Sequence, residues 1–165
     1  MVKKIPLIFN PSAHANKGSQ LADEIRKVST NIELIETKSF DHLKELVEGY
    51  VKDGIENICV AGGDGTINAV IDSILGTEIN LGVFPTGTMN LFAREMGLPL
   101  NNIKDCWNVI EKGKTKKIDI FKAGDSIFVQ VAGVGFDAKI IKETSWENKK
   151  KFGRSSYLVS AFNVA

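Results

Sequence analysis

The sequence predicts a three-layer α/β fold with a mostly parallel sheet, followed by the beginning of a β-rich region. Three observations favour this fold. Short apolar runs alternate with segments whose apolar residues recur every three or four positions, which is the spacing of an amphipathic helix. Two of the apolar runs end in glycine turns. Strands that alternate with helices of this length form right-handed βαβ crossovers, and these crossovers build parallel sheets.

The first third of the chain supplies two strands and two helices. The predicted elements are a strand over 4–10, a helix over 21–28, a strand over 32–37 and a helix over 43–51. The first strand ends at Asn10-Pro11, because proline cannot continue a central ladder. Asp41 is the expected N-cap of the second helix, and Gly54 closes that helix.

The stretch 57–75 carries the functional interpretation. Its strand over 58–61 stops at the glycine turn Gly62-Gly63-Asp64-Gly65-Thr66, and a helix over 67–75 follows. Such a turn gathers backbone N–H groups at the positive end of a helix dipole, which attracts phosphate. Glycines let the backbone approach a ligand closely, and the Asp64 carboxylate is a candidate ligand for Mg²⁺. The alternative is an ordinary turn, in which Asp64 bonds its own backbone and Thr66 caps the helix.

The strand, turn and helix pattern occurs a second time. Its elements are a strand over 81–84, the turn Pro85-Thr86-Gly87-Thr88, a helix over 89–96 and a further helix from Asn102 to Gly113. Gly97 and Pro99 separate the two helices. Ligands of parallel sheets bind beyond the carboxyl ends of the strands. Asn10, Thr37 and both glycine turns follow predicted strands, so we expect one crevice to collect them.

The pattern changes near residue 115, where a β-rich section begins. Strands over 116–122 and 127–132 flank a hairpin turn at Ala123-Gly124-Asp125-Ser126. Two or three strands without closing partners are marginal alone. We therefore expect a domain over 1–115 and an incomplete second domain over 116–165. Either the chain is a truncated piece of a longer protein, or another subunit of a homo-oligomer supplies the missing half.

Composition and charge narrow the class of protein. The 165 residues are 43% apolar and 25% charged, as in an ordinary folded protein. The net charge of +1 gives no reason to expect a nucleic-acid partner. The apolar run after Lys3 and Lys4 is too short for a signal sequence or a membrane span, which predicts a cytoplasmic protein. Cys59 and Cys106 fall on predicted core faces, and no Cys or His spacing is typical of a metal site.

Four motifs, in order along the chain, resemble those of the diacylglycerol kinase catalytic domain superfamily, which includes bacterial lipid kinases and the sphingosine and ceramide kinases. They are Asn10-Pro11-Ser12-Ala13, Gly62-Gly63-Asp64-Gly65-Thr66-Ile67-Asn68, Pro85-Thr86-Gly87-Thr88-Met89-Asn90 with Phe92-Ala93-Arg94, and Gly133-Val134-Gly135-Phe136-Asp137-Ala138. They resemble the family patterns NPxxG, GGDGT(I/L)N, PxGTxNxFAR and GxGFDA. A GGDG stretch alone would also fit NAD kinases and phosphofructokinases, but the last two motifs favour the lipid kinases.

The resemblance implies an NAD kinase/diacylglycerol kinase-like nucleotide-binding domain over 1–115 and the beginning of a β-sandwich lipid-substrate domain over 116–165. It implies an ATP- and Mg²⁺-dependent lipid kinase of phospholipid biosynthesis, which transfers the γ-phosphate to a hydroxyl of a diacylglycerol-like lipid. Asp64 is implied as the catalytic and metal-binding residue. The residues implied around ATP are Asn10, Pro11, Ser12, Ala13, His14, Thr37, Gly62, Gly63, Asp64, Gly65, Thr66, Ile67, Asn68, Ala69, Gly87, Thr88 and Asn90.

The chain departs from the family at three points. The family usually has Glu where this chain has Ala69 and Gly where it has His14, so we expect nucleotide affinity or metal geometry to differ. In the family, a later Asp-Gly-Glu type stretch carries the acidic base toward the lipid hydroxyl. That stretch has no counterpart here, so we expect little turnover from this chain alone.

Several alternatives stay open. Asn90 either contacts the ligand or ties the second turn to the first, and Arg94 faces either the phosphates or solvent. The lysines within 114–117 and the basic cluster 149–154 either attract anionic headgroups, giving peripheral contact with a membrane, or form a solvated face. An NAD kinase-type enzyme and a non-catalytic nucleotide-binding module are the alternative functions.

Overall fold

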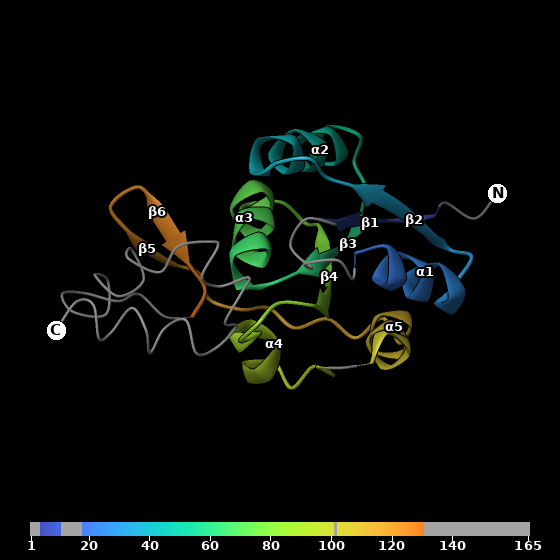
Figure 1. The fold of residues 1–165 in the computed structure, drawn as a ribbon. Coiled ribbons are helices and arrows are strands. Elements are labelled where there is room, and N and C mark those ends of the chain that lie inside the picture. Colours follow the sequence, from blue (N-terminus) through green and yellow to red (C-terminus); the bar gives the residue numbers. More distant parts are fainter. Residues whose placement is uncertain (1–3, 11–17, 101, 131–165) are drawn as a thin grey trace, which may run out of the picture. The chain divides into compact units, whose positions relative to one another are not determined.

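The computed structural model describes residues 4–10, 18–100 and 102–130 of the chain (Figure 1). The strands are β1 (Ile5–Phe9), β2 (Ile32–Glu36), β3 (Asn57–Gly62), β4 (Asn80–Pro85), β5 (Phe121–Ala123) and β6 (Ser126–Phe128). The helices are α1 (Gly18–Val28), α2 (Phe40–Lys52), α3 (Asp64–Ile74), α4 (Leu91–Glu95) and α5 (Ile103–Glu111). Within these ranges, no helix is both long enough and apolar enough to cross a bilayer.

Four strands form a parallel sheet in the order β2-β1-β3-β4. Phe9 is in register with both Glu36 and Ala61, and Gly62 is in register with Pro85. The carboxyl ends of all four strands therefore meet at one edge of the sheet, as the sequence predicts. The parallel sheet and the helices around it confirm the α/β fold class.

Helices cover both faces of the sheet (Figure 1). On β1, Leu7 and Phe9 pack in a cluster with residues of α1 and α5, whereas Ile8 packs with residues of α2 and α3. All three side chains are buried. Side chains of a strand alternate between faces, so a strand that is covered on both sides reads as a continuous apolar run. This explains why the predicted strands carry runs rather than alternation.

Both cysteines are free thiols in this core. Burial raises the pKa of Cys59 to about 12, and burial followed by the nearby Asp105 carboxylate raises the pKa of Cys106 to about 11. A thiol with such a pKa is protonated and unreactive near pH 7. The two cysteines therefore serve as small packing residues.

Two helix ends test the local sequence predictions. The hydroxyl of Ser39, not the carboxylate of Asp41, caps α2 by accepting from the N–H of His42 at 3.1 Å. The expectation for Asp41 is wrong because Asp41 lies inside the first helical turn. Its negative charge there interacts favourably with the positive end of the helix dipole. The prediction for Asn102 is confirmed, since its side chain accepts from the Asp105 N–H at 3.1 Å.

The predicted hairpin is present with shorter strands. β5 and β6 pair antiparallel around Gly124-Asp125, and Gly124 has the positive φ of +60° that such a turn requires. Ile118, Ile120, Ile127 and Val129 pack against the core cluster on the α2 and α3 side of the sheet. The described residues up to Val129, the hairpin included, belong to one compact unit. The domain division at 115/116 stays a prediction about where a different fold begins.

Candidate functional site

The predicted crevice starts at the carboxyl ends of β1 and β2. Thr37 is 3% exposed, and both its N–H and its hydroxyl donate to the carbonyl of Phe9, at 2.8 and 3.4 Å. The structure thus brings Thr37 beside the end of β1, next to Asn10. Pro11, Ser12, Ala13 and His14, predicted around the nucleotide, lie outside the described residues.

The first glycine turn, residues 62–66, leads into α3, and the amides that begin this helix have no acceptor within the described part of the chain. Gly63 is the N-cap of α3 and provides no side-chain cap, and the first N–H that bonds back is that of Ile67, to the Gly63 carbonyl at 3.0 Å. Among the described residues, no group accepts from the N–H groups of Asp64, Gly65 or Thr66. These three amides lie at the positive end of the helix dipole, the arrangement that binds anions.

Crowding differs among the glycines of this turn. A Cβ added at Gly62 would lie 2.6 Å from Cβ of Thr66, and one added at Gly63 would lie 3.1 Å from Cα of Gly87. A Cβ added at Gly65 would meet no atom of the described residues within 4 Å. Thr66 therefore packs over Gly62 and does not cap α3, contrary to the ordinary-turn alternative. The open space of the turn lies at Gly65.

The second glycine turn, residues 85–90, packs directly on the first. A Cβ added at Gly87 would lie 2.4 Å from Cα of Gly63, so the two backbones are in contact. The N–H of Thr86 donates to the carbonyl of Gly62 at 3.0 Å. We call residues 62–66 and 85–90 together the joined turns. The predicted meeting of both turns at one edge of the sheet is therefore present.

Asp64 links the first turn to α4 by its side chain. Its Oδ1 accepts a hydrogen bond from the N–H of Phe92 at 3.0 Å, at the start of α4. The ordinary-turn alternative assumed that Asp64 bonds its own backbone, but this carboxylate oxygen bonds the backbone of Phe92 instead. The bond bridges 28 residues of sequence, and no local pattern could have indicated it.

Asn90 and Arg94 complete the second turn. The Oδ1 of Asn90 accepts from the N–H of Gly87 at 2.8 Å, and its Nδ2 donates to the carbonyl of Pro85 at 3.5 Å. These two bonds stay within the second turn, so Asn90 does not tie the second turn to the first by a side-chain hydrogen bond, whereas Asp64 ties the first turn to α4. Arg94 donates from Nε to the carbonyl of Met89 at 2.9 Å. Sequence reasoning missed this contact, because an exposed Arg on a helix is usually solvated.

The residues after the first turn face the protein in this structure. Ile67 is fully buried in the core, and Ala69 packs against the same cluster. The side-chain amide of Asn68 donates to the carbonyl of Ile127 in β6 at 3.3 Å. These contacts give each residue a packing or tethering role, and their nucleotide contacts stay predictions.

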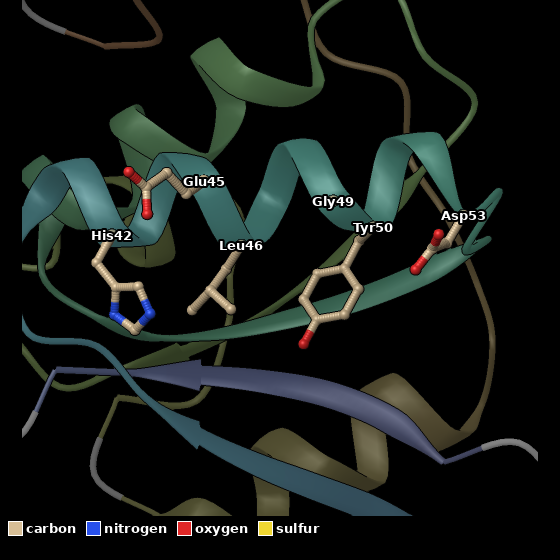
Figure 2. Close-up of a pocket in the computed structure, with 6 residues that line it drawn as sticks. All are labelled: His42, Glu45, Leu46, Gly49, Tyr50 and Asp53. Carbon is tan, nitrogen blue, oxygen red and sulfur yellow. The ribbon is translucent and has the colours of Figure 1, made fainter.

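A surface depression of about 270 Å³ lies elsewhere, along α2. Figure 2 shows His42, Leu46 and Tyr50 on the same side of that helix. Burial, followed by the carboxylates of Glu33 and Asp53, raises the pKa of Tyr50. Carboxylates repel phosphate, and none of the lining residues belongs to the joined turns. This depression is therefore a poor candidate for a phosphate site.

Comparisons with known proteins agree with the motifs. The family model of the diacylglycerol kinase catalytic domain matches residues 4–123. A diacylglycerol kinase of Mycobacterium tuberculosis is 31% identical over 122 residues, covering 71% of this chain and 39% of that protein. One of Staphylococcus aureus is 28% identical over 170 residues, covering 99% and 54%. The chain therefore spans about half the length of such relatives or less.

Solved structures of diacylglycerol kinases are also similar to this chain. The crystal structure of a diacylglycerol kinase from Bacillus anthracis aligns with a TM-score of 0.65 and 26% identity, over 76% of this chain and 49% of that one. A second B. anthracis crystal structure aligns with a TM-score of 0.70 and 25% identity, over 99% and 57%. Because the family model covers most of the chain, this protein belongs to the diacylglycerol kinase catalytic domain family.

Proposed function

We propose that this chain is the nucleotide-binding part of an ATP-dependent lipid kinase, which transfers the γ-phosphate of ATP to a hydroxyl of a diacylglycerol-like lipid. Family membership supports kinase chemistry, and relatives named diacylglycerol kinase support a lipid acceptor. The observation that carries the proposal is the first glycine turn, whose three leading amides have no acceptor among the described residues.

The amides of Asp64, Gly65 and Thr66 would hold the phosphates. Phosphoryl transfer depends mainly on positioning and on neutralising charge, and backbone N–H groups at a helix N-terminus do both. The open space at Gly65 leaves room for a phosphate oxygen near those amides. The second turn would hold this arrangement in place through the contact of Gly87 with Gly63.

Asp64 is the residue that would hold Mg²⁺. One of its carboxylate oxygens accepts from Phe92, and it is the sole carboxylate in the sequence of the joined turns. No group of three acidic, His or Cys side chains gathers within the described ranges. This fits Mg²⁺, which commonly binds through one or two carboxylates together with substrate phosphates and water. When bound, Mg²⁺ would neutralise charge on the phosphates.

The first test is binding. Titration calorimetry of the chain with ATP and Mg²⁺ is expected to show one site, and ATP without Mg²⁺ is expected to bind more weakly. The matched variant is Gly65→Ala, which adds a methyl group to the open space beside the amides and is expected to weaken binding about tenfold, or about 1.4 kcal/mol. Absence of ATP binding to the unmodified chain would refute the proposal.

The second test is the acceptor. The chain is incubated with γ-labelled ATP and either mixed lipid vesicles containing diacylglycerol or NAD. Labelled lipid, even at a low rate, is the expected product. Labelled NADP without labelled lipid would assign the chain to an NAD kinase-type activity and overturn the lipid assignment.

A further inference from the structure

We propose that Asn90 is a positioning residue for the first glycine turn. By fixing Gly87 against Gly63, it sets how tightly the α3 amides bind nucleotide phosphate. For the ligand this inference rests on the proposed function. For the geometry it rests on the contacts of the joined turns alone.

The backbone of Asn90 is held in an unusual conformation. Its φ of 49° and ψ of 47° lie in the left-handed region, and it is the sole non-glycine residue with positive φ in the part of the chain that the structure describes. Asn tolerates this region better than most residues, but the conformation persists only where the surroundings enforce it. The residue is 8% exposed, so the protein encloses it.

The Asn90 side chain closes the second turn around Gly87. Its Oδ1 accepts from the Gly87 N–H at 2.8 Å, and its Nδ2 donates to the Pro85 carbonyl at 3.5 Å. An added Cβ at Gly87 would also lie 2.9 Å from Oδ1 of Asn90, so the two residues fit closely. Asn90 therefore determines where the backbone of Gly87 lies.

A displacement of Gly87 would move the first turn directly, because the two backbones are in contact. No side chain separates Gly87 from Gly63, because each is a glycine and an added Cβ at either would meet the other's Cα, at 2.4 and 3.1 Å. Close-packed interiors transmit such displacements. Gly63 is the N-cap of α3, and its carbonyl accepts from the Ile67 N–H. A shift of Gly63 therefore moves the amides that are proposed to bind phosphate.

This role differs from a general contribution to stability. Groups that bind ligand atoms must be held within about 0.5 Å by the residues behind them, and a misplacement of about 1 Å far from the chemistry can cost about 100-fold in rate. Loss of the Asn90 side chain should therefore affect nucleotide binding more than a core truncation that destabilises the fold equally.

The test compares Asn90→Gly with Ile25→Val in the whole chain. Asn90→Gly keeps the left-handed backbone without steric cost and removes both side-chain hydrogen bonds. Ile25 is fully buried in α1 and is not part of the joined turns, so its truncation lowers the melting temperature without removing a hydrogen bond of the turns. In calorimetry with ATP and Mg²⁺, Asn90→Gly is expected to raise Kd at least tenfold, and Ile25→Val is expected to leave Kd within twofold.

A second measurement needs no nucleotide. In ¹H–¹⁵N spectra, Asn90→Gly is expected to shift the amide signals of Gly62, Gly63 and Gly65, whereas Ile25→Val is not. Asn90→Asp keeps the acceptor for the Gly87 N–H, and Asp tolerates the left-handed region. The amide signals of this variant should therefore stay close to those of the unmodified chain. If Asn90→Gly does not fold, Asn90→Ser, whose shorter side chain cannot make both hydrogen bonds, takes its place, and unchanged first-turn signals in that variant would overturn the inference.

The outcomes separate the two proposals. First-turn signals and a Kd that are unchanged in Asn90→Gly would refute the positioning role while leaving ATP binding established. Absence of ATP binding to the unmodified chain would refute the proposed function instead, and the amide signals would still decide whether Asn90 positions the first turn.

Discussion

The two glycine turns follow the same plan in the sequence, yet they begin helices of different kinds. The first leads into α3, which has 11 residues and starts with amides that no described group accepts from. The second leads into α4, which has five residues and begins at a left-handed Asn90. The α4 amide of Phe92 is already bonded, and its acceptor is Asp64 of the first turn.

This difference shows what distinguishes a binding turn from a supporting one. Both turns contain glycine because their backbones touch at Gly63 and Gly87, which is a packing requirement. Gly65 has no such requirement, since an added Cβ there would meet nothing within 4 Å. A glycine that packing does not need is the better indicator of a ligand, because the backbone must be approached from outside.

The largest expected effect comes from Gly87→Ala. The added methyl would lie 2.4 Å from Cα of Gly63, and a backbone atom cannot move aside as a flexible side chain can. We expect a loss of about 3 kcal/mol in the free energy of unfolding. In a domain of this size, such a loss corresponds to a fall of about 10 °C in melting temperature. Denaturant and thermal unfolding measure both quantities.

Gly65→Ala is the matched control within the same pair of turns. It places an identical methyl group in open space within the first turn of α3, so its stability should be unchanged or higher by up to about 1 kcal/mol. Equal destabilisation by the two variants would remove the distinction between a packing glycine and an open one.

Sequence reasoning could predict the sheet and the first turn because both depend on local patterns. Apolar runs and helical spacing are properties of neighbouring residues, and the phosphate interpretation of the stretch from Gly62 to Thr66 needs only a strand, a glycine turn and a helix. The common edge of the strand ends follows from the parallel topology. The strand order and register confirm the sheet and its common edge, and the phosphate interpretation stays a prediction.

The parts that sequence reasoning missed depend on contacts between distant residues. The bond from Phe92 to Asp64 spans 28 positions, and the fit of Gly63 on Gly87 depends on the spacing of β3 and β4. The helix predicted over 89–96 is shorter because the left-handed backbone of Asn90 cannot belong to a helix. Side chains that bond across the sheet edge leave no periodic signal.

The second largest expected effect concerns Asp64, and it separates the hydrogen bond to Phe92 from the proposed contact with Mg²⁺. Asp64→Ala removes the acceptor of the Phe92 N–H, so we expect a loss of about 1 to 2 kcal/mol in stability, as for other helix-start acceptors. Asp64→Asn keeps an oxygen acceptor and removes the charge, so its stability should stay close to that of the unmodified chain. Both variants should lose the Mg²⁺-dependent part of ATP binding.

Denaturant unfolding and calorimetry with and without Mg²⁺ give the two readouts. If Asp64→Asn is as unstable as Asp64→Ala, the charge rather than the hydrogen bond supports α4. If Asp64→Asn binds ATP with undiminished Mg²⁺ dependence, Asp64 is a link between the turns and not a metal ligand.

The smallest expected effect concerns Asn68, which connects α3 to β6. Asn68→Ala removes the bond to the Ile127 carbonyl, and a partly buried neutral bond contributes about 0.5 to 1 kcal/mol. Because the bond joins α3 to β6, amide hydrogen exchange should accelerate within the β5–β6 hairpin, while Kd for ATP should change less than threefold. The control is Asn80→Ala. The side-chain amide of Asn80 donates to the Glu56 carbonyl and to Oδ1 of Asn57, at the opposite end of the sheet. Faster exchange in the hairpin of both variants would mean that the hairpin responds to stability in general, and a large rise in Kd for Asn68→Ala alone would show that Asn68 contacts the nucleotide instead of tethering β6.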